Sequence, residues 1–257
     1  MVSQAFLTVD DQPITLAKAL QYLQTAGKLK SFVADVVRQY VIEQELQTRQ
    51  DIDVNPALIE QAVIDFRLQH QLTDPKVFAN WLVSSGKDYR SFHASVTYGF
   101  KLEKLKVQVT EPKLQEHFIE RKLFLDRVVL SRIIVAKAEL AEELASQIEE
   151  GASFEQLAAE YSITDDRIVN GMMGPVSRGS LPDVLRAAID SASLGKIVKP
   201  LAIEGRWGLF RVEQFLPASL EDPQLKQALQ NELFERWVAQ TIQKMTIKLN
   251  LTLQQVS

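Results

Sequence analysis

The residues in this sequence that could do chemistry gather between residues 127 and 215. Arg132 precedes the apolar run Ile-Ile-Val, and three carboxylates follow it at Asp165, Asp166 and Asp183. An arginine on a strand could donate hydrogen bonds to a peptide carbonyl or pair with a nearby acid, and the second is the more common use. Positioned carboxylates serve as general acids or bases. Because the local sequence is Thr-Asp-Asp-Arg, we interpret the adjacent pair as a solvated turn.

The other common catalytic groups are missing from this stretch. The sequence has no cysteine, and its histidines, His70, His93 and His117, all precede residue 118. A mechanism that needs a thiol is therefore excluded, and one that needs an imidazole would require a histidine to reach over from the earlier part of the chain. His117 has Glu116 and Glu120 beside it, but one histidine with flanking carboxylates predicts a surface face rather than a metal site. We find no phosphate-binding glycine loop or metal-ligand cluster, and expect no metal and no cofactor.

The composition narrows the class of protein. The 257 residues are 46% hydrophobic and 24% charged, which is typical of a globular chain, and the net charge is −4. No basic block indicates nucleic-acid binding, and no run of 18 apolar residues predicts a membrane span. The first 26 residues lack the basic and apolar regions of a signal peptide. The protein would be cytoplasmic if Met1 is its native start.

Residues 14 to 124 predict helices with short joints. Asn55-Pro56, Asp74-Pro75 and Thr110-Glu-Pro112 each place a capping side chain before a proline that favours the first helical turn. Thr15 is a further cap, for a helix to about Thr25 that Gly27 can end. The 3.6-residue period of Leu29–Gln50 predicts a long amphipathic helix. A plain helical bundle and a module that cradles a substrate explain this pattern equally well.

Two further patterns complete the predicted elements. Residues 127–215 predict a strand, two helices, a turn-rich loop at Asn170–Gly179, a helix from Leu181 and two strands joined at Glu204-Gly-Arg. After Asp222-Pro223 comes a long helix, and then the alternating Thr246–Leu253. That alternation predicts a strand, which needs a partner for its backbone groups. We expect it to pair with Phe6–Val9 and so bring both ends of the chain to one helical domain.

The order and spacing of the elements in residues 127–215 resemble a parvulin-type (PpiC, rotamase) peptidyl-prolyl isomerase domain. The flanking helical motifs, Val9–Thr15 and Thr110–Phe118, resemble SurA-type periplasmic chaperones and, more loosely, PrsA-type foldases. The resemblance implies an α+β protein, with a mostly helical chaperone core built from both termini and an inserted parvulin-like domain of a small antiparallel sheet flanked by helices. The expected domains are residues 1–125, residues 126–216, and residues 217–257 packing back on the first.

The resemblance also implies where an isomerase site would lie. Such domains use two histidines and an Asp or Cys, and here the matching positions hold Arg132, Met172 and Gly208. We therefore predict a degenerate catalytic site, with no catalytic residue assigned. The apolar positions around the proline ring fall on Leu181 and on Leu185 or Val184. Because Met is adaptable and Trp supplies area, Met172, Leu181, Leu185 and Trp207 are the expected substrate-binding residues, with core packing as the alternative.

Three functions remain open after these observations. We favour a SurA-like chaperone that binds unfolded or partly folded polypeptides, among them outer-membrane or secreted proteins. An active isomerase with an altered site is the first alternative. A dedicated partner-binding factor of a secretion or peptide-maturation system is the second. The resemblance implies a periplasmic location, while the charge and hydropathy patterns predict no nucleic-acid partner and no insertion into a membrane.

Overall fold

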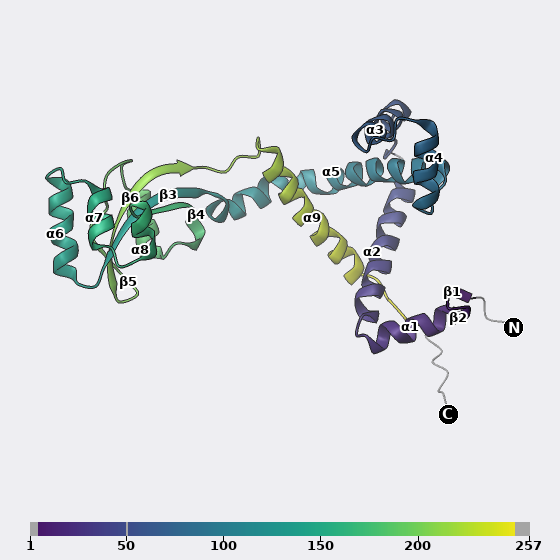
Figure 1. Ribbon diagram of the computed structural model, residues 1–257, viewed down its shortest axis with the longest axis horizontal. Coiled ribbons are helices and arrows are strands. Elements are labelled where there is room, and N and C mark those ends of the chain that lie inside the picture. The colour runs from purple at the N-terminus through teal and green to yellow at the C-terminus, as the bar shows by residue number, and fades with distance from the viewer. Residues whose placement is uncertain (1–4, 50, 250–257) are drawn as a thin grey trace. The chain divides into compact units, whose positions relative to one another are not determined.

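The computed structural model describes residues 5–49 and 51–249, and the chain divides into two compact units. The first unit combines residues 1–114 with residues 230–257, and the second is residues 115–229. The first is mainly helical and the second holds a four-stranded antiparallel sheet, so the fold is of the mixed α+β class that we expected (Figure 1). Each unit is described by itself below.

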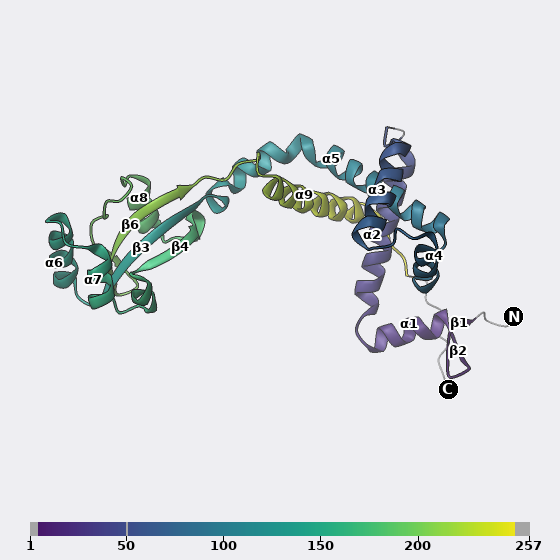
Figure 2. The same ribbon diagram turned by 45° about the horizontal axis from the view of Figure 1, so that its top comes forward.

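The first unit begins with a hairpin and a helical corner. Strands β1 (Ala5–Val9) and β2 (Gln12–Thr15) pair with each other, and α1 (Leu16–Thr25) and α2 (Leu29–Thr48) follow. Thr15 caps α1 by accepting a hydrogen bond from the Lys18 amide at 3.3 Å, as predicted. Gly27 has φ +68°, which lets the chain turn sharply between the two helices (Figure 2).

Two short helices and the next long one form an aromatic core. Two of the three predicted proline caps are confirmed: Asn55 caps α3 (Pro56–Gln69), and Asp74 caps α4 (Pro75–Ser84). The side chains that these helices bury against α5 (Tyr89–Leu125) include three aromatic rings besides aliphatic residues. The buried members of this cluster are Val63, Leu72, Phe78, Leu82 and Phe92, with Phe66 and Trp81 packed against them.

The third predicted cap is wrong. Residues 89–125 form one helix of 37 residues, and Pro112 lies inside it rather than at the start of a new helix. Thr110 does not cap, because its hydroxyl donates to the carbonyl of Lys106 at 2.7 Å in the preceding turn. Apolar residues on both sides of the proline, Leu105 and Leu114, are buried, and this packing opposes a break. None of the helices in residues 5–49 and 51–249 is long and apolar enough to cross a bilayer.

The C-terminal helix α9 (Pro223–Gln243) supplies part of the core of the first unit. Phe234 and Val238 are buried with Ile42 of α2 and Leu105 of α5. Arg38 of α2 also forms an ion pair with Glu235, at 2.6 Å. Segments nearly 200 residues apart in sequence therefore share one hydrophobic cluster.

The predicted pairing of the C-terminal strand is not found in the described residues. Strand β1 pairs with β2, and Thr246–Leu249 form neither strand nor helix. The remainder of the predicted strand, residues 250–253, lies outside the described residues. A two-residue turn at Asp10 and Asp11, both with positive φ, gives β1 a nearer partner, and local pairing needs less loop closure than pairing across the chain.

The second unit is a sheet with helices on both faces. Its strand order is β4-β3-β6-β5, and all neighbours are antiparallel. Helices α6 (Ala138–Glu149) and α7 (Phe154–Tyr161) pack on one face, and α8 (Asp183–Asp190) packs on the other (Figure 1). The strands are β3 (Arg127–Val135), β4 (Met172–Ser177), β5 (Leu201–Ile203) and β6 (Arg206–Leu216), and the helices are α6 (Ala138–Glu149), α7 (Phe154–Tyr161), η1 (Asp165–Val169), η2 (Arg178–Ser180) and α8 (Asp183–Asp190).

One strand was missed and one turn was confirmed. The segment that we predicted as a turn-rich loop contains β4, which the glycine and proline content of Gly-Met-Met-Gly-Pro concealed. Glu204 and Gly205 form the predicted turn between β5 and β6, with φ values of +49° and +76°. Consecutive positive φ values are typical of the tightest hairpin turns.

A buried carboxylate ties the two ends of the sheet unit together. Asp126, which precedes β3, accepts hydrogen bonds from Lys122 at 2.7 Å and from the Ala218 amide at 2.8 Å. Arg178 of η2 lies 3.4 Å from the same carboxylate. Burial raises the pKa of Asp126, but these donors and charges outweigh it and the pKa is lowered overall. The carboxylate is therefore held ionised where the chain enters and leaves the unit.

Candidate functional site

Arg132 lies on β3 and pairs with a carboxylate from another element. Its Nε lies 2.6 Å from an oxygen of Asp166 in η1. The side chain of Asp166 is only 14% exposed and that of Arg132 is 31% exposed. The interpretation of Asp166 as part of a solvated turn is therefore wrong, and of the two uses weighed for Arg132, the structure has the ion pair.

A relay of hydrogen bonds holds Asp166 in place. Its second oxygen accepts from the Thr164 hydroxyl at 2.6 Å, and Thr164 contacts the Ser162 hydroxyl at 2.9 Å. Ser162 in turn accepts from the backbone amide of Ile134 at 3.1 Å. Both carboxylate oxygens are thus engaged, and the relay runs back to β3 only two residues beyond Arg132. This arrangement orients the acid toward the arginine.

Gly171 lets β4 begin beside Arg132. The amide of Arg132 donates to the Gly171 carbonyl at 2.8 Å, and the Gly171 amide donates to the Asp166 carbonyl at 2.8 Å. Gly171 has φ +79°, and a Cβ there would lie 2.3 Å from the Arg132 carbonyl oxygen. Only glycine combines that conformation with so close a backbone approach. The Asn170-Gly171 pair in the sequence is the signal that could have located this contact.

Gly208 has no room for a side chain. It pairs with Ile134 in the sheet, and a Cβ at this position would lie 2.5 Å from the Phe210 ring and 3.0 Å from the Ile134 side chain. The Phe210 ring is buried at 3% exposure, so it cannot swing into solvent to make space. The surrounding core therefore fills the volume that a histidine would need at this position.

The four predicted substrate-binding residues do not converge. Leu181 and Leu185 are buried at 9% and 3% exposure in the cluster that joins α8 to the sheet. Trp207 packs half-buried against the cluster on the opposite face, with α6 and α7. Met172 is 54% exposed, and Met173 beside it packs toward α8 instead. A role for these residues in substrate binding stays a prediction.

A second charged group on the α6–α7 face was not anticipated. Arg211 of β6 donates to Glu155 at 2.6 Å and to Glu213 at 2.7 Å, and its guanidinium lies 4.5 Å from the centre of the Phe154 ring. The hydrogen bond from Arg211, with further bonds from backbone and Ser153, lowers the pKa of Glu155 to about 2. The partners satisfy one another, so the cluster fastens α7 to the sheet.

The helical unit presents apolar side chains to water. Phe32, Val36 and Tyr40 of α2 are 41%, 52% and 53% exposed. Residues four apart lie on one face of a helix, so the three form a continuous row, here called the α2 stripe. Of the residues of α2, only Val41 and Ile42 are buried. Other large apolar residues exposed on α3 and α4 are Leu58, Ile64, Leu68, Val77 and Val83.

The sheet unit offers little acid–base chemistry around Arg132. Asp166, the carboxylate that contacts Arg132, is bonded at both oxygens. Among the described residues, no three His, Asp or Glu side chains gather where a metal ion could be held. The arrangement can donate hydrogen bonds from the Arg132 guanidinium and present apolar surface. An isomerase would have to lower the barrier to rotation of an X-Pro bond, which is about 18–20 kcal/mol.

Comparison with known proteins identifies the type of domain formed by most of the sheet-containing second unit. Residues 132–214 match the rotamase family model, described as a PPIC-type PPIASE domain. The foldase protein PrsA of Halalkalibacterium halodurans is 31% identical over 111 residues, which are 42% of this chain and 33% of that protein. The chaperone SurA of Pseudomonas aeruginosa is 31% identical over 84 residues, which are 33% of this chain and 20% of that protein.

These matches are partial. The chain spans a third or less of the length of these two curated relatives. Among solved structures, the peptidylprolyl isomerase PrsA of Bacillus cereus is similar with a TM-score of 0.46 and 16% identity, covering 97% of this chain and 95% of that one. Residues 132–214 therefore form a parvulin domain of the PPIC type, and the chain that carries it is homologous over part of its length to the PrsA foldases and SurA chaperones.

Proposed function

We propose that this protein is a chaperone that binds unfolded or partly folded polypeptides through its helical unit, and that its parvulin domain has little or no isomerase activity. The observation that carries the proposal is the α2 stripe of Phe32, Val36 and Tyr40. Exposed apolar residues scattered singly are normal, whereas a row of them on one helix is a candidate interaction surface. The partial homology to PrsA and SurA supports the same function.

The state of the parvulin domain supports the second half of the proposal. The position next to the apolar run on β3 holds Arg132, which is already paired with Asp166 at 2.6 Å. The position after Trp207 holds Gly208, where a side chain would clash with Phe210. Polar assistance by a positioned side chain is typically worth about 10²- to 10⁴-fold in rate. Most of the isomerase rate should be absent even if the domain binds proline.

The chaperone function is tested by suppression of aggregation. The full chain is added to three unrelated chemically unfolded proteins as they are diluted into buffer, and light scattering is followed. We expect suppression of all three, and a large loss in the triple variant Phe32→Ser, Val36→Ser, Tyr40→Ser. The matched control removes as much exposed apolar surface elsewhere, with Leu58→Ser, Val77→Ser, Val83→Ser, and should keep most of the effect.

The outcomes separate the alternatives. Suppression limited to a single client class would favour a dedicated partner-binding factor of a secretion or peptide-maturation system. Equal loss in the two triple variants would contradict the α2 stripe as the binding surface. The natural clients of the chaperone would include secreted or outer-membrane proteins if the protein is exported to the periplasm, as its relatives suggest.

The isomerase alternative is tested with a protease-coupled proline assay on the full chain. We expect acceleration that is weak or absent beside an ordinary parvulin at the same concentration. A rate close to that of the ordinary parvulin would contradict the degenerate site. Restoring Gly208→His is not an informative variant, because the added side chain would meet Phe210 and Ile134 in the core.

A further inference from the structure

A groove in the helical unit lies where α1 meets α2. It encloses about 420 Å³, a volume within the usual range for ligand sites, about 300–1,000 Å³. Its floor is formed by Leu29 and Val33 of α2, while Gln24 and Lys30 supply polar groups at its margin. The corner at Gly27, with φ +68°, opens the angle between the helices that creates this space.

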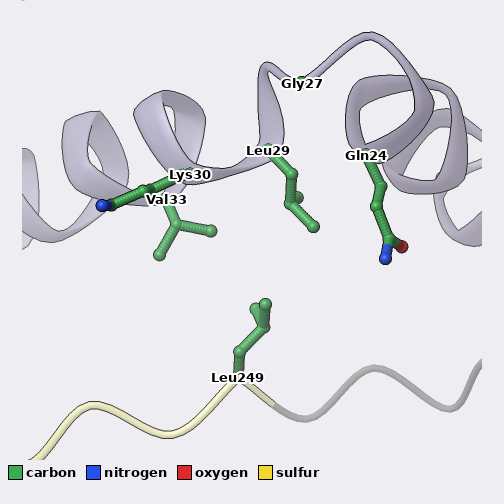
Figure 3. Close-up of a pocket in the computed structure, with 6 residues that line it drawn as sticks. All are labelled: Gln24, Gly27, Leu29, Lys30, Val33 and Leu249. Carbon is green, nitrogen blue, oxygen red and sulfur yellow. The ribbon is translucent and has the colours of Figure 1, made fainter.

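The chain's own C-terminal segment lies on the open side of the groove. Leu249 lines it, and its side chain points toward Leu29 and Val33 across the gap (Figure 3). Residues 246–249 form neither helix nor strand. The sequence around them, Thr-Ile-Lys-Leu-Asn-Leu-Thr-Leu, places an apolar residue at every second position. In an extended chain such residues share one face, which could lie along an apolar floor.

The contact is shallow. Leu249 remains 54% exposed although it lines the groove, and Ile247 is 48% exposed. The free energy gained by burying an apolar side chain grows with the area removed from water, so a half-covered leucine gains only part of it. A segment held so weakly can leave the groove and return.

We propose that the groove between α1 and α2 is a binding site for extended peptides with apolar residues at alternate positions, and that Thr246–Leu249 is its resident occupant, which such a peptide must displace. The groove adjoins the α2 stripe, because Val33 lies three residues before Val36 on the same helix, and the inference rests on the proposed function and deepens it, since an unfolded client would supply the competing peptide. Because Thr246–Leu249 is joined to α9 by a short stretch of chain, it stays near the groove, and this sets how strongly it competes with a free peptide. A short flexible linker gives an effective concentration on the order of 1 mM. If the tethered segment itself binds the groove with a Kd of about 0.1 mM, the groove is occupied about ten times as often as it is empty, and a free peptide binds about tenfold more weakly to the natural chain than to one with an empty groove.

The first test uses a fluorescent synthetic peptide with the sequence of residues 246–253, so it does not depend on any client. Anisotropy titration of the full chain should give weak binding, and Leu249→Ser should strengthen it about tenfold. Lys248→Ser, the matched control on the same segment, should leave it unchanged. Adding Val33→Asp to Leu249→Ser should abolish binding, while adding Val83→Asp, on an exposed face outside the groove, should not. Unchanged affinity in Leu249→Ser, or binding that survives Val33→Asp, would overturn the proposal.

The second test locks the segment in place. The sequence contains no cysteine, so Val33→Cys with Leu249→Cys creates a single pair. Oxidation should form an intramolecular disulfide and block the peptide, and reduction should restore binding in the same sample, which removes any concern about folding. The control pair, Val83→Cys with Leu249→Cys, should not form an intramolecular disulfide. A disulfide between two molecules would show that a second copy supplies the segment, and would contradict an occupant from the same chain.

Discussion

At the residue scale, two ion pairs of equal length differ in their surroundings. Arg132 and Asp166 are 2.6 Å apart with exposures of 31% and 14%, while Arg38 and Glu235 are 2.6 Å apart with exposures of 38% and 58%. Exposed pairs contribute about 0–1 kcal/mol, since water screens them. Hydrogen bonds to charged groups away from water contribute about 1.5–3 kcal/mol. The distance between the charged atoms alone therefore does not predict which of the two pairs contributes more to stability.

The first prediction concerns those pairs. A double-mutant cycle of Arg132→Met and Asp166→Asn should give a coupling energy of about 1–2 kcal/mol, measured by denaturant unfolding. The matched cycle of Arg38→Met and Glu235→Gln should give less than about 1 kcal/mol. Equal couplings would show that Asp166 is better solvated than its burial indicates, and that Arg132 is free to meet a substrate.

The second prediction concerns Gly208. Gly208→Ala should destabilise the protein by about 1–3 kcal/mol, because the added methyl lies 2.5 Å from Phe210 in a filled core. Gly99, inside α5, has open space where an added methyl group would lie, so Gly99→Ala should instead stabilise by about 0.5–1 kcal/mol. Thermal unfolding compares the two. A neutral Gly208→Ala would mean that the core can relax enough to accept a side chain there.

At the element scale, α7 is fastened to β6 by charge as well as by packing. Arg211 lies over Phe154 and donates hydrogen bonds to Glu155 and Glu213. Burial lowers the pKa of Arg211, but the hydrogen bonds and charges of the two glutamates outweigh it and the pKa is raised overall. The pKa of Glu155 is lowered from 4.5 to about 2, chiefly by the hydrogen bond from Arg211. The folded state therefore favours the ionised carboxylate of Glu155.

The third prediction follows from that pKa. A group with a lowered folded pKa stabilises above its unfolded pKa, and the stabilisation disappears as the pH falls through the folded value. The stability difference between the natural chain and Glu155→Gln should thus be constant above about pH 5 and shrink between pH 4.5 and about 2. Chemical unfolding at several pH values measures it. A flat difference for Glu155→Gln would contradict the ion pair with Arg211.

At the scale of the whole molecule, the first unit is built from two segments of sequence that flank the second. Phe234 and Val238 of α9 pack with Ile42 and Leu105, which come from the other segment. We propose on this basis that the helix after the parvulin domain completes the N-terminal helical domain, and that the parvulin domain is an insertion between them.

The fourth prediction tests that organisation. Phe234→Ala should destabilise the helical unit by about 3–5 kcal/mol, the usual cost of removing a fully buried phenylalanine. Hydrogen exchange should show lost protection in α2 and in the first half of α5, with protection in β3 and β6 retained. Phe215→Ala, a 37% exposed phenylalanine of β6, is the control and should leave α2 protected. Equal loss of protection in both units after Phe234→Ala would contradict two separate cores.

Local chemistry was sufficient to predict much of the helical framework. Asn55-Pro56, Asp74-Pro75 and Thr15 cap helices as expected, because a cap depends on a few neighbouring residues and a fixed backbone geometry. The same rule failed at Thr110-Glu-Pro112. There the packing of side chains on both sides of the proline outweighed a local signal that is identical in kind.

The sequence by itself determined that residues 118–257 hold neither a cysteine nor a histidine, so an imidazole at the parvulin domain would have to come from the earlier part of the chain. Only the tertiary structure decided which contacts surround the positions where the family resemblance expects catalytic groups. The ion pair of Arg132 with Asp166, the core that closes over Gly208, and the groove that Leu249 overlies all join residues far apart in sequence. Such contacts depend on how strands and helices pack in three dimensions, which composition, periodicity and capping signals do not specify.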